Sequence, residues 1–274
     1  MAANGPGRKY SGSPLAPRPG LAGWLRLLAG LAFPRACPEC GAPPAADDVF
    51  CPACAAAVDR LVPSCPRCGS PAGPGETPGA ACAACRREPP PFEQAFAPWR
   101  HAGPPARAVA DFKYRYRWAT GWELAQALGR EIPPAWLTWA QVAAPVPLHP
   151  RRLLRRGFNQ SLVLARGLAR AARQQGGELP VAARLLARLR HTRPQVGLND
   201  GQRRQNVAGA FGPGREAARW LTGRRVLLVD DVCTTGATVA ECARVLLAQG
   251  AQAVRVVTLT RAGHEPAGLP PRQP

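Results

Sequence analysis

The segment at 225–238, RVLLVDDVCTTGAT, restricts the fold more than any other part of the chain. Its apolar start has the composition of a buried strand, and Asp230 and Asp231 follow at the C-terminal end of that strand. A loop of small residues then leads into a helix predicted over 237–249, and a further strand is predicted over 253–259. Alternation of strand, helix and strand predicts a parallel sheet covered by helices on both faces.

The chemistry of this segment suits a phosphorylated sugar. In an open parallel sheet, ligands bind just beyond the C-terminal ends of the strands. Residues 234–238 would offer hydroxyls and backbone N–H groups at a helix N-terminus, where a phosphate is favoured, and Gly236 would let the backbone approach closely. Asp230 and Asp231 suit ribose hydroxyls or a magnesium ion. The plainer alternative, in which Asp231 only caps the helix, explains neither the second carboxylate nor the loop.

The remaining elements of this half are less sharply marked by the sequence. In chain order we expect a helix at 106–129 interrupted near 116–121, a strand at 141–148, a helix at 159–174, an ambiguous segment at 181–189 and a polar, arginine-rich loop at 191–210.

Ten cysteines indicate metal binding rather than a disulfide framework, and so a reducing compartment. Eight of them form four CxxC pairs, while Cys233 and Cys242 stand alone and are assigned no catalytic role. Two CxxC turns complete a shell of four sulfurs for structural zinc, whereas redox-active CxxC motifs would not occur as four tandem pairs in a coil-rich segment. Pairing of neighbouring motifs is the simpler arrangement, and an interleaved one also fits the spacing. The expected ligands of the two zinc ions are Cys37, Cys40, Cys51, Cys54, Cys65, Cys68, Cys82 and Cys85.

The segment 225–238 closely resembles the phosphoribosyl pyrophosphate (PRPP) motif of type I phosphoribosyltransferases. In that family the two acidic residues hold the ribose 2′ and 3′ hydroxyls, and the following loop holds the 5′-phosphate. The resemblance implies a type I phosphoribosyltransferase fold, with Asp230 and Asp231 as catalytic ribose ligands and Mg²⁺ bound with PRPP. The phosphate-binding residues that it implies are Thr234, Thr235, Gly236, Ala237 and Thr238.

Basic segments narrow the resemblance to the ComF family, which is associated with DNA uptake in competent bacteria. RRLLRRGFNQ occupies 151–160, RPQVGL begins at Arg193, FKY occupies 112–114, and the cysteine pairs complete the pattern. The resemblance covers nearly the whole chain, from about Leu21 to Arg261.

The predicted strand 141–148 would end beside the sugar site, which brings the following arginines to the pyrophosphate side. We therefore expect Arg155, Arg156 and Gly157 to bind PRPP, since guanidinium groups suit phosphate oxygens. The segment 191–210 would be a hood that closes over the substrate and excludes water. A solvated basic face is the alternative for any single arginine of this group.

Composition adds the outline of the domains. The net charge of +19 is carried mainly by arginine, which is also abundant in proteins from GC-rich genomes, so charge alone supports nucleic-acid binding only weakly. No run of 18 apolar residues occurs, and we expect a cytoplasmic protein without membrane insertion. The expected parts are a disordered tail (1–20), a lead-in helix (21–36), a double zinc ribbon (37–88), a phosphoribosyltransferase-like domain (92–262) and a second disordered tail (263–274).

The family resemblance implies an enzyme that displaces pyrophosphate at ribose C1, with an unidentified acceptor. The rival interpretation is a non-catalytic accessory protein that senses PRPP or binds single-stranded DNA and DNA-uptake proteins. Lys113 would then contact phosphate, and Tyr114, Tyr116, Trp118 and Trp122 would stack on bases. The same aromatic residues would serve equally as core between ribbon and domain. A third interpretation, an RNA- or ribosome-associated zinc-ribbon protein, leaves the DDVCTTGAT loop without a role.

Overall fold

The computed structural model describes residues 35–45, 48–73, 75–114, 118–192 and 199–262. The chain divides into two units, Met1–Arg35 and Ala36–Pro274, and the elements below belong to the second. Both predicted tails, and all but the end of the predicted lead-in helix, lie outside the described residues.

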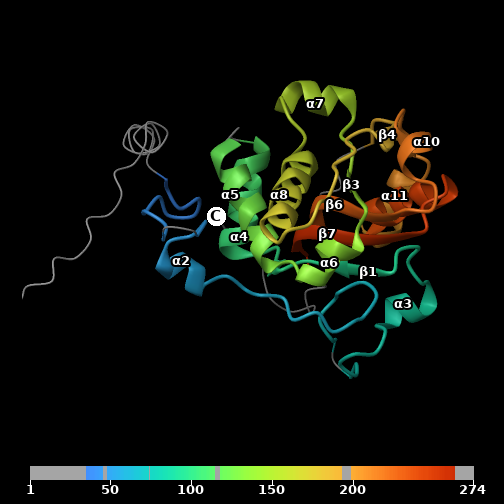
Figure 1. The fold of residues 1–274 in the computed structure, drawn as a ribbon. Coiled ribbons are helices and arrows are strands. Elements are labelled where there is room, and N and C mark those ends of the chain that lie inside the picture. Colours follow the sequence, from blue (N-terminus) through green and yellow to red (C-terminus); the bar gives the residue numbers. More distant parts are fainter. Residues whose placement is uncertain (1–34, 46–47, 74, 115–117, 193–198, 263–274) are drawn as a thin grey trace, which may run out of the picture. The chain divides into compact units, whose positions relative to one another are not determined.

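A five-stranded parallel sheet forms the centre of this unit (Figure 1). Its strands are β1 (Gln94–Phe96), β2 (Trp99–Arg100), β3 (Val142–Pro145), β6 (Arg225–Cys233) and β7 (Ala253–Arg261). They lie in the order β1-β7-β6-β3, and β2 also pairs with β7. The parallel sheet predicted from the strand–helix–strand pattern is confirmed.

Side chains of β6 alternate between two hydrophobic cores, because successive residues of a strand point to opposite faces. Leu227 and Val229 belong to the core that also holds Phe112 and Leu164. Val226 and Leu228 belong to the other core, beneath Leu246. A strand buried on both faces requires a continuous apolar run, and that run is what identified it in the sequence.

The helices fall into two groups that cover the two faces of the sheet. The first core is built with α4 (Gly103–Tyr114), α5 (Trp118–Glu131), α6 (Pro134–Trp139) and α8 (Gln160–Gln174). The second core is built with α11 (Ala237–Ala248), α9 (Asp200–Val207), α10 (Ala217–Trp220) and the hairpin of β4 (Leu186–Arg188) and β5 (Phe211–Pro213). The short helices α2 (Pro52–Ala56) and α3 (Ala83–Arg87) belong to the cysteine-rich segment, and α7 (Pro150–Arg156) precedes α8. In the described part of the chain, no helix has the length and apolar character that crossing a bilayer would require.

Three predicted boundaries were wrong. The strand predicted at 141–148 ends at Pro145. The strand expected to end at the acidic pair continues to Cys233, because β7 supplies pairing as far as Arg261. The predicted loop 191–210 contains α9, whose start is stabilised by reciprocal hydrogen bonds between Asn199 and Gln202.

Candidate functional site

Two adjacent carboxylates lie inside the last, extended part of β6 rather than beyond its end. Asp230 pairs in register with Thr258 of β7. Its Oδ1 accepts hydrogen bonds from the hydroxyl of Ser161, at 2.9 Å, and from the backbone N–H of Asp231, at 2.9 Å. Burial, reinforced by the charge of Asp231, raises the pKa of Asp230 to about 7. The site therefore holds one carboxyl that gives up its proton only near neutral pH.

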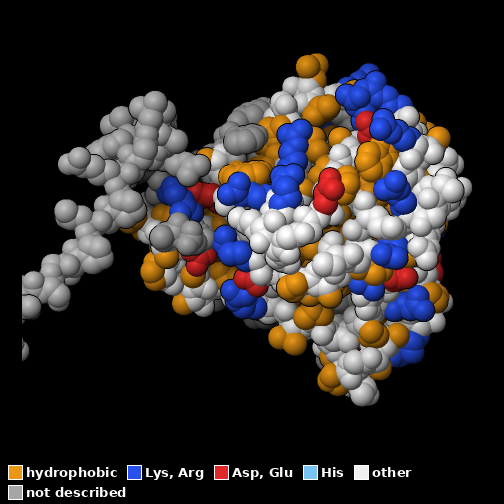
Figure 2. All heavy atoms as spheres, viewed as in Figure 1, with side chains coloured by type: hydrophobic (Ala, Val, Ile, Leu, Met, Phe, Trp, Pro, Cys, Tyr) orange, Lys and Arg blue, Asp and Glu red, His pale blue; other side chains and the backbone are white. Residues whose placement is uncertain are grey.

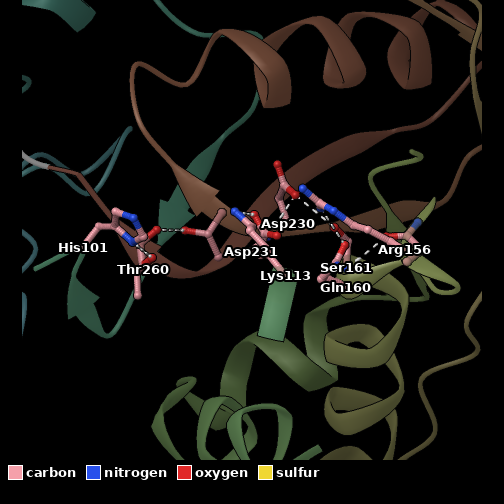
Figure 3. A network of polar contacts seen from close by, with 10 residues as sticks. His101, Lys113, Arg156, Gln160, Ser161, Asp230, Asp231 and Thr260 are labelled. Atoms are coloured by element: carbon pink, nitrogen blue, oxygen red, sulfur yellow. Dashed lines mark hydrogen bonds and ion pairs between the residues drawn. The ribbon is translucent and has the colours of Figure 1, made fainter. Parts of the chain in front are cut away.

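Lys113, at the end of α4, forms an ion pair with the second carboxylate (Figure 3). Its Nζ lies 2.9 Å from Oδ1 of Asp231, and their side chains are only 19% and 12% exposed. Next to this pair, Nδ1 of His101 lies 2.8 Å from the hydroxyl oxygen of Thr260 on β7. Burial lowers the pKa of His101, and so does the charge of Lys113. Asp231 thus already has a cationic partner, which a ligand would have to share or displace.

The loop after β6 has the geometry that the sequence predicted for phosphate binding. Gly236 adopts a left-handed conformation, with φ of 79°, at the N-cap of α11, and the helix begins at Ala237. The first turn of a helix has backbone N–H groups without partners inside the helix. Here that turn helps to line a small hollow, formed by residues 232–234 and 236–239. The hollow directly follows the acidic pair along the chain.

Helix α7 presents its arginines in two directions. Arg152 and Arg156, one turn apart, are partly buried, whereas Arg151 and Arg155 are exposed. Gly157 ends the helix in the left-handed conformation and is itself exposed. Arg156 lies over the ring of Tyr114 at 5.3 Å, and its Nη1 donates to Oε1 of Gln160 at 3.1 Å. Of the predicted PRPP ligands on this helix, Arg156 points toward the acidic pair, as Figure 3 shows.

Four buried side-chain nitrogen atoms have no hydrogen-bond partner among the described residues, and one of them is Nε1 of Trp99. The other three belong to residues near Asp230: Nε of Arg156, Nε2 of Gln160 and Nε of Arg188. All three are donors. Unpaired buried donors are rare in folded proteins and often mark the place of a ligand or an ordered water. Because the donors belong to two arginines and an amide, the missing partner is expected to be an anion rich in oxygen atoms.

Arg188, on β4, was not predicted as a site residue. Its Nη2 donates to the hydroxyl of Thr192 at 2.5 Å, and its guanidinium lies 5.1 Å from the ring centre of Phe211. Arg152 donates to the carbonyl of the same Thr192, at 2.9 Å. Burial lowers the pKa of Arg188, as does the charge of Arg152. The local sequence at 181–189 fits a helix or a strand, so nothing in it indicated that this arginine faces the site.

The eight paired cysteines form two clusters. Four sulfur atoms come from Cys37, Cys40, Cys51 and Cys54, and four from Cys65, Cys68, Cys82 and Cys85; within each cluster all lie within 4.8 Å of one another. Neighbouring motifs are therefore paired, as the simpler of the two predicted arrangements required.

The sulfur positions fit zinc. A zinc–sulfur bond of 2.3 Å in a tetrahedron places the sulfurs about 3.8 Å apart. The sulfurs of Cys40 and Cys51 are 3.5 Å apart, and those of Cys68 and Cys82 are 3.7 Å apart. Burial opposes ionisation of Cys65, but backbone N–H groups, including that of Cys82, outweigh it and lower the pKa of this thiol to about 6. Cys65 is thus prepared to supply thiolate, the form that binds metal.

The same two parts appear in comparisons with known proteins. Residues 159–268 match the family described as Phosphoribosyl transferase domain, and residues 28–86 match the Double zinc ribbon domain. DNA utilization protein YhgH of Escherichia coli K12 is 34% identical over 181 residues, which cover 65% of this chain and 76% of that protein. Competence protein F of Haemophilus influenzae is 30% identical over 182 residues, covering 65% and 77%.

The chain belongs to the ComF family. Its fold class is accordingly that of a type I phosphoribosyltransferase preceded by a double zinc ribbon. Among solved structures, glutamine PRPP amidotransferase from B. subtilis is 23% identical, with a TM-score of 0.32, over 50% of this chain and 25% of that one. So limited an overlap adds nothing to the family assignment.

The aromatic residues that would stack on bases in the DNA-binding interpretation occupy different environments in this ComF chain. Tyr114 is 62% exposed and lies beneath Arg156. Trp122 packs against the core that also holds Phe50 of the first ribbon. Tyr116 and the side chain of Trp118 lie outside the described residues. Of the two that can be placed, Tyr114 is the exposed one, and Arg156 covers one face of its ring.

Proposed function

We propose that this ComF protein binds PRPP with Mg²⁺ at the carboxyl edge of the sheet and transfers its phosphoribosyl group to an acceptor. The observation that carries the proposal is the group of three unpaired buried donors beside Asp230 and the loop of residues 234–238. PRPP has a matching arrangement, because its ribose carries hydroxyls in the middle, a phosphate at one end and a pyrophosphate at the other.

Each part of the site would take one part of PRPP. Asp230 and Asp231 would hold the ribose hydroxyls, and the 5′-phosphate would lie in the hollow at the start of α11. The pyrophosphate would face Arg156 and Arg188. When bound, Mg²⁺ would be held by oxygen atoms of PRPP and of the acidic pair and would neutralise charge on the phosphates.

The chemistry would be a displacement at ribose C1. The bond between C1 and the pyrophosphate oxygen breaks, its electron pair leaves with pyrophosphate, and the acceptor supplies the electron pair of the new bond to C1. Arg156 and Arg188 stabilise the departing charge, and the acidic pair keeps the ribose in place through the oxocarbenium-like transition state. No side chain of the described site is positioned as a dedicated base, so the acceptor would supply its own nucleophile.

We further propose that this activity serves DNA uptake or the use of imported DNA. The proposal is supported by the names of two relatives, Competence protein F and DNA utilization protein YhgH. The acceptor would be a product of that process or a component of the uptake machinery. The PRPP-sensing and single-stranded-DNA-binding alternatives share the same site and differ in whether pyrophosphate is released.

Titration calorimetry with PRPP and Mg²⁺ on the zinc-loaded protein tests the site directly. The two arginines of α7 provide a matched pair, because Arg156 faces the acidic pair and Arg155 is exposed. We expect Arg156→Gln to weaken binding by tenfold or more, about 1.4 kcal/mol, and Arg155→Gln to change it by less than about threefold.

Two results would contradict parts of the proposal. Equal losses in the two arginine variants would place the pyrophosphate elsewhere. Absence of PRPP binding in the wild-type protein, with single-stranded DNA bound in a strongly salt-dependent manner, would favour the DNA-binding alternative.

A further inference from the structure

Arg261, the last residue of β7, lies between the second zinc cluster and the loop that follows β6. Its Nη1 donates to the sulfur of Cys233 at 3.1 Å, and its Nη2 donates to the hydroxyl of Ser70 at 2.8 Å. The hydroxyl of Ser70 lies 3.1 Å from the sulfur of Cys68, one of the zinc ligands. A continuous series of contacts thus runs from the second cluster, through one guanidinium, to Cys233.

Among the described residues, no carboxylate forms an ion pair with Arg261 to balance its charge. Its two side-chain partners are a hydroxyl and a buried thiol. A zinc ion held by four thiolates carries a net charge of about −2, and in a partly buried setting that charge attracts a nearby cation strongly. The metal-loaded second cluster is therefore the anion that this guanidinium faces.

The second ribbon contacts the sheet directly, so a structural change in the ribbon can reach the sheet. The N–H of Ala95 on β1 donates to the carbonyl of Arg67, inside the Cys65–Cys68 turn, at 2.7 Å. Gly69 approaches so closely that a Cβ added there would lie 2.3 Å from the carbonyl oxygen of Ala95. Because β1 pairs with β7, the turn that carries two zinc ligands is connected through β1 to the strand that ends in Arg261.

At its other end, the series reaches the proposed phosphate loop. Cys233 is 4% exposed, and it helps to line the hollow at the start of α11. Its carbonyl accepts from the N–H of Ala262, and a Cβ on Gly236 would lie 3.9 Å from its sulfur. Movement of Cys233 would consequently move Thr234 and the turn at Gly236.

We propose that Arg261 is a positioning residue through which the second zinc centre fixes the phosphate loop. Metal loading of the second ribbon holds the guanidinium, the guanidinium holds Cys233, and Cys233 sets the start of the loop. The effect on PRPP rests on the function proposed above, whereas the coupling between zinc and loop does not. The first ribbon makes no such contact among the described residues, so the two zinc sites have different roles.

The experiment compares Arg261→Gln, Arg261→Lys and Ser70→Ala in the full-length, zinc-loaded protein. Arg100→Gln is the matched control, because Arg100 pairs in register with Arg261 on the neighbouring strand but forms an exposed ion pair with Asp59. Zinc release to a chromogenic chelator is followed without PRPP, and alkylation of the released thiols identifies the ribbon. We expect Arg261→Gln to speed zinc release from the second ribbon about tenfold and to leave the first unchanged.

Amide hydrogen exchange at residues 234–238 is the second readout, and it too needs no PRPP. Exchange there should accelerate in Arg261→Gln, to a smaller extent in Ser70→Ala, and recover in Arg261→Lys, which keeps the charge. Unchanged zinc release or unchanged loop exchange in Arg261→Gln would overturn the coupling. If Arg261→Gln does not fold, Ser70→Ala decides by the same two readouts. If the protein binds no PRPP but Arg261→Gln still shows faster zinc release and faster loop exchange, the coupling would be supported. Only the proposed substrate would then be rejected.

Discussion

Replacing Asp230 with asparagine tests whether the ionised carboxylate of Asp230 destabilises the folded, ligand-free protein. Burial and the neighbouring Asp231 raise the pKa of Asp230 from an ordinary 3.8 to about 7. A carboxyl whose pKa is raised on folding keeps its proton in the native state while the unfolded chain loses it. Stability is therefore unaffected below pH 3.8, falls as the pH rises from 3.8 to about 7, and is constant above that.

The full effect of this shift corresponds to about 4 kcal/mol above pH 7. Asparagine cannot ionise, and its side-chain oxygen can still accept from the hydroxyl of Ser161 and the N–H of Asp231. We expect Asp230→Asn to be about 2 to 4 kcal/mol more stable than wild type at pH 8, with part of the gain offset by the weaker acceptor. The same variant should not bind PRPP.

Urea unfolding of the metal-loaded, PRPP-free protein between about pH 5.5 and 8 measures this difference, which should grow by about 2 kcal/mol across that range. Comparing the variant with wild type at each pH cancels the titration of the zinc ligands. Asp231→Asn is the control, and its expected effect on stability has the opposite sign. It leaves the partly buried Lys113 without its partner and should destabilise the protein by about 2 kcal/mol. A stability difference for Asp230→Asn that does not change with pH, or a loss of stability, would refute the reasoning.

Three further outcomes are expected. Gly236→Ala should lower stability by about 1 kcal/mol and weaken PRPP binding, because alanine is strained at φ of 79°; urea unfolding and calorimetry measure the two effects. Gly167→Ala should lower the free energy of unfolding by about 1 to 3 kcal/mol, because the added Cβ would lie 2.5 Å from the Cβ of Ala125 in the packed pair α5 and α8. Gly201→Ala, in the exposed helix α9, is its control and should be neutral or slightly stabilising in the same urea experiment. Removal of both zinc ions by a chelator should unfold the ribbons while the parallel sheet persists, seen as fast hydrogen exchange at residues 37–88 and, through Arg261, faster exchange at residues 234–238.

Local sequence patterns predicted those features whose determinants lie close together in the chain. The apolar run of β6, the helix after it and the sulfur pairs each depend on residues within a few positions of one another. In the predicted helix at 106–129, the apolar residues Val109, Phe112, Leu124 and Leu128 are all buried. The predicted helix at 159–174 also begins with a local signal, since the side chain of Asn159 caps it by accepting from the N–H of Ser161.

Features that depend on contacts between residues far apart in the chain could not be predicted from local sequence patterns. The continuation of β6 past Asp230 depends on the length of β7, and Arg188 reaches the site only because β4 pairs with β5 beside α11. The pairing of Lys113 with Asp231 joins residues 118 positions apart along the chain. The helix α9 is the exception, because the Asn199–Gln202 capping box is a local signal that the polar composition of the segment obscured.

The extended end of β6 explains how the fold accommodates two adjacent carboxylates. A loop would let the side chains of Asp230 and Asp231 rotate freely, whereas a paired strand fixes the direction of each side chain. Each carboxylate then meets a different partner: Asp230 accepts from the hydroxyl of Ser161 on α8, and Asp231 pairs with the ammonium group of Lys113 on α4. One carboxylate is neutralised by a cation and the other by retaining its proton at moderately acid pH. Binding of Mg²⁺ and PRPP would have to replace both arrangements. The affinity for Mg²⁺ and PRPP would therefore depend on the protonation of Asp230 and on the position of Lys113.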